Sequence, residues 1–396
     1  MTSNINVVHK DFIITRFLVF LMAAACGITV ANLYYAQPLL SEIARTFQIS
    51  QAYIGLLAML TQIGYAMGML FLLPLGDIRE RRSFIVFMLF MAACALLLMS
   101  ASFNIGMLFF AAFAVGFASI SPQLIIPFAA QLASPKERGR VIGTIMSGLL
   151  IGILVSRTFS GIIGVAFGWR IVYISAAVMM LILAISLKKL LPLSEPVLDI
   201  NYVNLLRSLW GIVNNEPVLR EASFTGAMMF AGFSVFWTSL VFLLESSVYN
   251  LGAQAAGMFG LVGVVGALAA SLVGRMADKK SPRFTLRIAI IICILSYVCL
   301  WFLGFKLMGL VIGVILLDLG TQSGQVSNQT RIFDLNPKAN NRINTVFMFS
   351  YFMGGAAGSI IGAYSWSYFG WNGVCVSGLM FEIIAAVIYF RGRKNN

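Results

Sequence analysis

Long runs of apolar residues, separated by short polar segments, recur along the whole chain. Twelve of these runs are long enough for an α-helix that crosses the roughly 30 Å hydrocarbon core of a bilayer. They span residues 13–39, 52–73, 83–102, 105–130, 141–167, 170–187, 220–244, 254–276, 284–304, 307–330, 343–366 and 371–390. Lys10 and Arg16 stand at the start of the first run, as they would in a signal peptide, but the similar runs that follow favour a retained helix. The pattern predicts an all-α polytopic membrane protein with twelve transmembrane helices.

Composition agrees with this class and limits the possible functions. Hydrophobic residues make up 60% of the 396 residues and charged residues only 10%, whereas about a quarter of a soluble globular domain is charged. The net charge is +13, but the basic residues form short clusters between apolar runs, so no continuous phosphate-binding stripe is available for nucleic acid. Five cysteines stand singly in apolar runs, and the one histidine is His9. No metal site, cofactor site or disulfide framework is predicted.

The distribution of Lys and Arg predicts the orientation in the membrane. An even number of spans places both termini on one side, and the segments of that side hold 23 of the 27 basic residues. The opposite loops hold only Arg45, Arg170 and Lys306. By the positive-inside rule, both termini are expected in the cytoplasm, with the protein in the cytoplasmic (inner) membrane.

Short motifs recur at an offset of about 202 residues. "FGW" at 167–169 returns at 369–371, and Arg140 aligns with Arg342. Further pairs with nearly the same offset are Pro135 with Pro337, Ser121–Gln123 with Ser323–Gln325, and Asp77 with Asp278. Such a repeat predicts two pseudo-symmetric six-helix bundles, at residues 1–190 and 220–396, related by an axis along the membrane normal.

The segment 191–219 is the longest connection and is predicted to be a cytoplasmic linker between the bundles. Apolar residues recur at helical spacing from Tyr202 to Ile212, behind Asp199 as a possible helix cap. An interfacial helix is therefore expected here, with a solvated linker as the alternative.

The duplicated six-plus-six layout, the cytoplasmic termini and the long central loop resemble the major facilitator superfamily. In "LPLGDIRERR" (73–82), the residues Gly76, Asp77, Arg81 and Arg82 are similar to the loop between the second and third helices of that family. The second copy, "GRMADKKSPR" (274–283), keeps Gly274, Ala277 and Asp278. The resemblance implies the major facilitator fold, a monomer, and a conformational latch in which each aspartate meets a helix N-terminus of the other half. Interfacial charges that only set topology are the alternative.

The stretch "GLLIGILVSRTFSG" (148–161) lies where the drug and metabolite antiporter branch carries its fifth-helix signature. Gly152 and Gly161 match that signature, whereas Ser156, Arg157 and Ser160 replace two glycines and a proline. Gly148, Gly152 and Ser156 share one helix face at a spacing of four residues, and the repeat partner in the eleventh span has Gly354, Gly358 and Gly362 at the same spacing. Small-residue faces let helices approach closely, so Gly152, Gly161, Gly354 and Gly358 are predicted to act in gating, with simple packing as the alternative.

Three ionisable residues lie deep within predicted spans: Arg157, Asp318 and Glu382. An unpaired charge at the bilayer centre costs about 2.5–3.5 kcal/mol even on insertion scales, so each should face an aqueous cavity or a partner. The antiporter branch also carries an arginine in its fourth helix, and the fourth span here has none. Arg157 is therefore the candidate cation of the cavity, and a purely structural guanidinium is the alternative.

Asp318 is the first candidate for proton coupling. It shares one helical stripe with Gln322, Gln325 and Gln329, as expected for a helix that lines a cavity. Removal from water favours the protonated form of a carboxyl group, which suits proton exchange. Glu382 is the second candidate, although a structural or lipid-facing role is favoured for it because the twelfth helix of this fold is usually peripheral.

The resemblance also implies where substrate binds, because the first, fourth, seventh and tenth helices of the superfamily surround a central cavity. The candidate substrate-binding residues are Asn32, Tyr34, Tyr35, Gln37, Gln123, Arg157, Trp237, Gln322 and Gln325. Tyr34 and Tyr35 are neighbours in sequence and cannot face the same way, so one of them is expected to pack in the core.

The predicted function is secondary active transport of a small organic molecule by alternating access, as proton-coupled efflux by an antiporter. Proton-coupled uptake of a nutrient or metal chelate by a symporter is the alternative, because the sequence barely records direction. A membrane enzyme or a non-transporting receptor is the third hypothesis. The chain carries no HExxH motif, Walker loop or metal-ligand cluster, which argues against an enzyme. The expected partners are the substrate, protons and the lipid bilayer.

Overall fold

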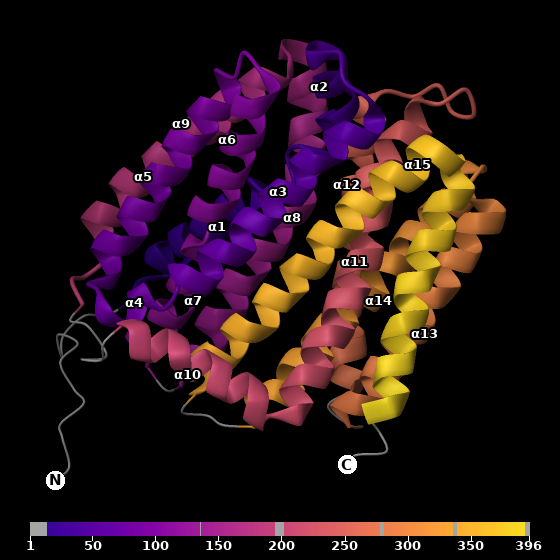
Figure 1. The fold of residues 1–396 in the computed structure, drawn as a ribbon. Coiled ribbons are helices and arrows are strands. Elements are labelled where there is room, and N and C mark those ends of the chain that lie inside the picture. The colour runs from indigo at the N-terminus through magenta and orange to yellow at the C-terminus, as the bar shows by residue number, and fades with distance from the viewer. Residues whose placement is uncertain (1–13, 135, 195–201, 278–280, 336–338, 393–396) are drawn as a thin grey trace, which may run out of the picture.

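The computed structural model describes residues 14–134, 136–194, 202–277, 281–335 and 339–392, and these residues are almost entirely helical (Figure 1). The elements are α1 (Arg16–Ala31), η1 (Gln37–Leu39), α2 (Leu40–Phe47), α3 (Gln51–Phe71), α4 (Leu75–Ile78), α5 (Arg81–Ser100), α6 (Ile105–Ala118), α7 (Ser121–Leu132), α8 (Arg138–Phe167), α9 (Trp169–Leu190), α10 (Tyr202–Asn215), α11 (Pro217–Glu245), α12 (Ala253–Ala277), α13 (Pro282–Leu303), α14 (Leu307–Phe333) and α15 (Asn340–Gly392). Nine described segments are long and apolar enough to cross a membrane, with α6 and α7 forming one of them. The shorter apolar α1, helix α12 and the second limb of α15 complete the twelve expected spans. The predicted fold class is confirmed.

Two equivalent turns show how the repeated sequence folds. Helix α8 ends before Gly168, whose φ is 86°, and α9 begins at Trp169. Helix α15 changes direction at Gly370, whose φ is 58° and which lies 202 residues after Gly168. Glycine populates positive φ without steric cost, so the shared "FGW" motif makes the same turn in both halves.

The first span departs from the expected continuous helix over 13–39. Helix α1 ends at Ala31, a turn covers residues 32–36, and η1 begins at Gln37. Pro38 lies in the first turn of η1, and a proline has no N–H to donate to a continuing helix. The break leaves a buried, irregular segment that carries Asn32, Tyr34 and Tyr35.

The helices form two groups, α1–α9 and α11–α15, which lie side by side in Figure 1. Small residues let helices of one group touch. Any side chain at Gly152 would overlap the backbone of Gly27 on α1, and any at Gly354 or Gly358 would overlap the backbone of α11. Gly152, Gly354 and Gly358 therefore pack helices within a group.

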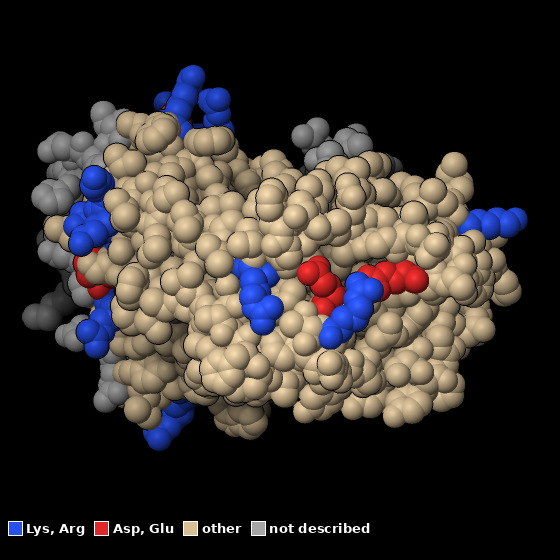
Figure 2. Space-filling view, turned by 90° about the horizontal axis from the view of Figure 1, so that it is seen from above, with Lys and Arg blue, Asp and Glu red and all other residues tan. Residues whose placement is uncertain are grey.

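The two groups meet on the face that carries α2 and the turns at Gly168 and Gly370, which we call the α2 face. Helix α3 packs against α15, and α8 packs against α12 with Gly161 on Gly257. The amide of Gln62 donates a hydrogen bond of 2.7 Å to Oγ of Ser359. The space-filling view of this face shows a continuous surface with few charged side chains (Figure 2). The α2 face is closed.

A second set of contacts joins the two helix groups near the exposed edge of the α2 face. Nε1 of Trp366 donates to Oε1 of Gln51 at 2.9 Å. Arg45 forms an ion pair of 3.4 Å with Glu245, and the Arg45 side chain is 70% exposed. These contacts add to the closure but lie where water reaches them.

The opposite face, which carries α4 and α10, is called the α10 face. A cavity of about 550 Å³ lies between the two groups there, lined by residues of α7, α8, α10, α14 and α15. Its polar lining residues are Arg81, Gln123, Gln325, Gln329, Asn340, Asn341, Arg342, Asn344 and Thr345.

The linker helix α10 lies across the mouth of this cavity (Figure 1). The hydroxyl of Tyr202 donates to the Phe71 carbonyl at 2.7 Å, and Arg342 donates to Oγ of Ser208 at 3.2 Å. Leu205 and Leu209 face inward and line the cavity. The segment 191–219 thus does contain a helix, although Asp199, its expected cap, lies outside the described residues.

Candidate functional site

Arg157 of α8 is fully buried where the two helix groups meet. Its Nε donates a hydrogen bond of 2.7 Å to Oε1 of Gln37. Its guanidinium carbon lies 3.8 Å from the ring centroid of Trp237 and 4.9 Å from that of Tyr34. The guanidinium does not extend to a membrane surface. The two terminal nitrogens, Nη1 and Nη2, have no hydrogen-bond partner in the described part of the chain.

The local structure explains how this aromatic clamp, made of Tyr34, Phe233 and Trp237, forms around Arg157. The break after α1 brings Tyr34 and Gln37 toward α8. Phe233 and Trp237 are four residues apart on α11 and therefore share one face, with Phe233 5.6 Å from the guanidinium carbon. A desolvated cation–π contact contributes about 2 kcal/mol or more. Arg157 is thus held by residues from both helix groups.

Asp318 of α14 is the opposite charge of the site, and only 1% of its surface is exposed. It packs against Gly263 and Gly266 of α12. A Cβ atom at either glycine would come too close to the Asp318 side chain. Both carboxylate oxygens have no hydrogen-bond partner among the described residues. Asp318 interacts electrostatically with Arg157 through space, but no ion pair within 4.0 Å joins the two among the described contacts. Two opposite charges are therefore buried near each other without direct contact.

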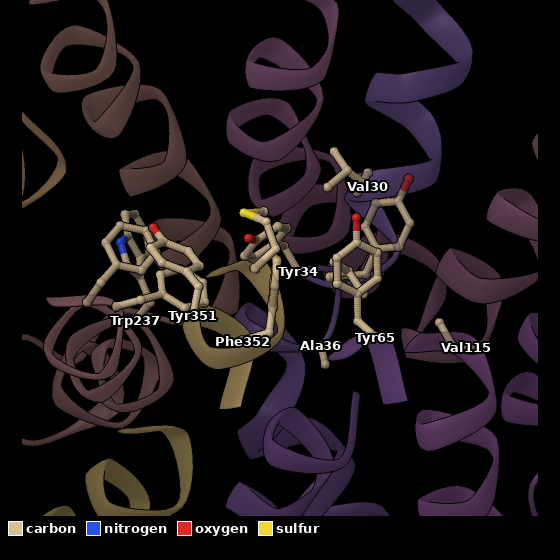
Figure 3. Close-up of a cluster of buried hydrophobic side chains, with 14 of the residues drawn as sticks. Val30, Tyr34, Ala36, Tyr65, Val115, Trp237, Tyr351 and Phe352 are labelled. Atoms are coloured by element: carbon tan, nitrogen blue, oxygen red, sulfur yellow. The ribbon is translucent and has the colours of Figure 1, made fainter. Parts of the chain in front are cut away.

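An aromatic layer separates the clamp from the cavity on the α10 face. It consists of Tyr65 on α3, Phe230 on α11, and Tyr351 and Phe352 on α15. Ring centroids are 4.5 Å apart for Tyr65 and Phe352, and 4.1 Å apart for Phe230 and Tyr351. Phe230 also stacks on Phe233 of the clamp at 5.5 Å. Figure 3 shows Tyr34, Tyr65, Tyr351, Phe352 and Trp237 in one band across both groups.

The aromatic layer also touches the polar wall of the cavity. The amide of Gln123 donates to the Tyr65 hydroxyl at 3.3 Å, and the Tyr351 hydroxyl donates to Gln325 at 3.4 Å. Gln123 and Gln325 both line the cavity. A molecule that enters from the α10 face thus meets amides first, then the aromatic layer, and then Arg157 and Asp318.

Comparison with known proteins identifies the family to which this architecture belongs. The sequence profile of the Major Facilitator Superfamily matches residues 17–342. The chain belongs to this superfamily. It is 41% identical over 375 residues to the transporter YgaY of Escherichia coli O157:H7, with 95% of each chain covered. It is 34% identical over 361 residues to a probable transporter of Streptomyces coelicolor, covering 91% of this chain and 84% of the relative.

The solved structures agree on the fold. A bacterial homologue of the human lysosomal transporter Spinster, in an inward-facing and occupied conformation, superposes with a TM-score of 0.73, 15% identity and 96% of each chain covered. As a member of the Major Facilitator Superfamily, the protein is a polytopic membrane transporter rather than an enzyme. The family assignment made from the sequence is confirmed.

The superfamily architecture brings together some of the predicted substrate residues and not others. Tyr34, Gln37, Arg157 and Trp237 meet in the clamp, and Gln123 and Gln325 line the cavity. The remaining three are not among the described clamp contacts or the described cavity lining. Asn32 donates to Oγ of Ser119 at 3.2 Å, Tyr35 packs on Phe159 with centroids 5.8 Å apart, and Gln322 is half-buried. Tyr34 therefore faces the site and Tyr35 packs away from it.

Sequence reasoning missed Tyr65, Phe230, Phe233, Tyr351 and Phe352. Each is an aromatic residue inside an apolar span, where the sequence carries no sign that separates a core aromatic from a site aromatic. Only Gln123 and Gln325, the partners of Tyr65 and Tyr351, gave a signal, because amides within a span indicate a wet surface.

Glu382 lies inside the C-terminal helix group. It is completely buried. Its carboxyl group packs against Gly232 on α11, where a Cβ atom would clash with it. The Tyr297 hydroxyl donates to the carbonyl of the same Gly232. Both Glu382 oxygens have no hydrogen-bond partner among the described residues. The inner face of this peripheral helix is thus packed against α11, and Glu382 does not face lipid.

The described latch residues of the first copy, Gly76, Arg81 and Arg82, lie on the α10 face of the transporter. Nε of Arg81 donates to the Gly76 carbonyl at 3.2 Å, and Arg82 donates to the Leu191 carbonyl at 3.1 Å. These contacts remain within the N-terminal group. The Asp77 side chain and all of Asp278 lie outside what the structure describes, so the latch stays a prediction.

Glu80 begins α5 beside these arginines. Its carboxylate accepts hydrogen bonds from the backbone N–H of Arg82, Ser83 and Ser194. Burial by itself would raise the pKa of Glu80, but the hydrogen bonds from Ser83, Ser194 and Arg82 outweigh it and hold the pKa below its usual value.

Proposed function

We propose that this superfamily member is a proton-coupled secondary transporter that moves a small organic molecule across the cytoplasmic membrane by alternating access. One observation carries this proposal: Arg157 and Asp318, from opposite helix groups, are buried at the boundary between the groups, and their polar atoms have unused bonding capacity among the described residues. Because the site lies within one chain, a monomer suffices.

Protonation of Asp318 provides the coupling. An uncompensated buried charge is expensive, so a proton on Asp318 removes one charge and also removes the attraction to Arg157. That attraction acts between α14 of one group and α8 of the other. A change in it shifts the equilibrium between two arrangements of the groups, which is what a coupling ion must do.

The two faces support alternating access. The α2 face is closed by α3 on α15 and by α8 on α12, whereas the α10 face holds the cavity. In the other state, the Gln62–Ser359 hydrogen bond would break and the cavity would close. The clustered Lys and Arg residues predict that the α10 face and both termini are cytoplasmic, so the described state would receive molecules from the cytoplasm.

Export is the direction that the resemblance to the antiporter branch implies. A ligand would enter the cavity from the cytoplasm and reach the clamp, and a proton arriving at Asp318 from outside would favour its release. Export by antiport requires that the ligand and the proton bind alternately.

Uptake by symport is the second candidate, and one observation favours it. Arg157 keeps its charge whatever the state of Asp318, so a proton on Asp318 leaves Arg157 uncompensated. A negatively charged ligand would restore neutrality. In that case the ligand and the proton bind to the same state of the transporter.

Reconstituted liposomes test the proton coupling. Protein is reconstituted with a pH-sensitive dye inside, and a ligand found by thermal-shift screening is added under an imposed pH gradient. We expect the wild type and Glu382→Gln to show ligand-dependent proton flux, and Asp318→Asn to lose it. Flux that persists with the same pH dependence in Asp318→Asn would remove Asp318 from the mechanism. The direction of ligand movement relative to the proton separates antiport from symport.

A further inference from the structure

We propose that the central site takes an organic anion, a carboxylate on a flat apolar body, which binds Arg157 most tightly when Asp318 is protonated. This inference rests on the proposed role of Asp318 as the proton site and adds the chemical class of the ligand. Because the proton and the anion then bind to the same state, it belongs to the symport candidate and not to antiport.

The route to the site favours anions. Among the described residues that line the cavity, Arg81 and Arg342 are basic, and none of these described residues is acidic. The remaining polar lining consists of Asn, Gln and Thr side chains, which can donate to oxygen atoms. A cleft lined by one sign of charge concentrates ligands of the opposite sign. Among these described lining residues, a cation would find no acidic side chain before it reached Asp318.

The guanidinium of Arg157 is preorganised for a carboxylate. Gln37 holds Nε, and Trp237 covers the guanidinium at 3.8 Å, so the plane of the group is fixed. The two terminal nitrogens remain without a hydrogen-bond partner among the described residues, although the side chain is fully buried. Two parallel N–H donors match the two oxygens of a carboxylate, which gives a bidentate pair.

The surroundings of Arg157 suit a flat apolar body. Tyr34, Phe233 and Trp237 surround the guanidinium, and Phe230 and Tyr351 of the aromatic layer follow toward the cavity. Aromatic pairs stabilise each other beyond the area they bury. A ring attached to the carboxylate can therefore exchange places with layer side chains at little cost.

Charge balance links the anion to the proton. With Asp318 ionised, Arg157 and Asp318 sum to zero; with Asp318 protonated the pair carries +1, and a bound monoanion returns the sum to zero. The other groups that interact with Asp318 are Tyr34, Cys293 on α13 and Tyr351 on α15. Phenols and thiols are ordinarily neutral near pH 7, and from the described part of α12 the glycines Gly263 and Gly266 lie against Asp318. Protonation and anion binding must therefore strengthen each other.

The test uses the purified full-length transporter and matched aromatic probes. Benzoate, phenylacetate and indole-3-acetate are compared with their uncharged amides and with phenethylamine, by thermal shift and calorimetric titration at pH 6 and pH 8. We expect at least one carboxylate to bind at least tenfold more tightly than its amide, and at least tenfold more tightly at pH 6 than at pH 8. Phenethylamine should not bind.

Variants of Asp318 and Arg157 test which residue causes the pH dependence and which causes the preference for the carboxylate. Asp318→Asn should bind the carboxylate with the pH 6 affinity at both pH values. Arg157→Gln should lose the preference for the carboxylate over the amide, and Arg157→Lys should keep part of it. Circular dichroism and the melting temperature of each variant show that it is folded.

Several results would overturn the inference. They are amides that bind as well as carboxylates, binding that is weaker or unchanged at pH 6, and no binding of any carboxylate up to about 10 mM, which corresponds to a binding free energy of roughly −3 kcal/mol. The proposed function is tested separately. If Asp318→Asn abolishes proton-coupled flux of another ligand while no carboxylate binds, only the ligand class is wrong.

Discussion

The hydrogen bond between Gln62 and Ser359 should decide how strongly the α2 face is held shut. It joins α3 to α15 at 2.7 Å, and both residues are buried. In Ser359→Ala, the Gln62 amide would lose its partner only in the closed state. Leaving a buried donor unsatisfied costs about 1–3 kcal/mol, and 1.4 kcal/mol is about a tenfold change in an equilibrium constant. The closed population should therefore fall by about 5- to 150-fold relative to the open one.

The ion pair between Arg45 and Glu245 provides the matched control on the same face. Its length is 3.4 Å, and the Arg45 side chain is 70% exposed. Exposed ion pairs contribute about 0–1 kcal/mol. The Glu245→Gln variant should therefore shift the same equilibrium by at most about fivefold, although it removes a full charge.

Distance measurements between spin labels can report the two populations. Cysteines replace Phe103 in the N-terminal group and Lys306 in the C-terminal group, both exposed next to the α2 face, after the exposed native Cys94 has been changed to Ser. Opening of the α2 face lengthens the distance between the labels. The population with the longer distance should therefore increase far more in Ser359→Ala than in Glu245→Gln. If the charge removal shifts the distances more than the loss of the buried hydrogen bond does, the ranking by burial is refuted.

Three further perturbations test other parts of the structure. Gly370→Ala places a side chain at φ 58°, which should cost about 1–3 kcal/mol and lower the melting temperature; Gly211→Ala within α10, where a Cβ meets no atom, should not. Glu221 lies 3.0 Å from Arg331 and is 9% exposed, so Glu221→Gln should destabilise the protein by about 3–5 kcal/mol in denaturant unfolding, and a loss under 1 kcal/mol would contradict that pair. The pKa of Glu80 is lowered in the folded state, so its contribution to stability is present above the ordinary carboxyl pKa and is lost as pH falls. Melting curves from pH 7 to pH 3 should show a smaller loss in Glu80→Gln, and parallel curves would argue against the capping contacts.

Much of the fold could be predicted from local signals. Apolar runs of spanning length located the helices, because a backbone in lipid must satisfy its own hydrogen bonds. The "FGW" motif indicated the repeat, and both of its copies lie at equivalent turns where Gly168 and Gly370 have positive φ. The end of α1 was the main error in the predicted spans, although Pro38 was visible in the sequence. An apolar run alone does not distinguish a continuous helix from one that unwinds inside the protein.

The candidate site was predicted in part. A lone arginine and a lone aspartate within apolar spans indicate a polar interior, since lipid does not solvate them. The neighbours of Arg157 could not be found in the same way. Gln37, Arg157 and Trp237 are separated by 120 and 80 residues, and no local pattern relates them. The resemblance to a known family suggested the helices that line the site, but not the aromatic layer formed by Tyr65, Phe230, Tyr351 and Phe352.

The sequence by itself determined that this chain spans a membrane twelve times, that its halves repeat, and that Arg157 and Asp318 should face a polar interior. These properties depend on hydropathy, chain length and charge, which each segment carries locally. Only the tertiary structure decided that Arg157 stacks on Trp237, that Asp318 stays out of direct contact with it, and that Glu382 is enclosed within one helix group. The packing of distant helices sets those contacts, because each depends on which faces of two or more helices meet.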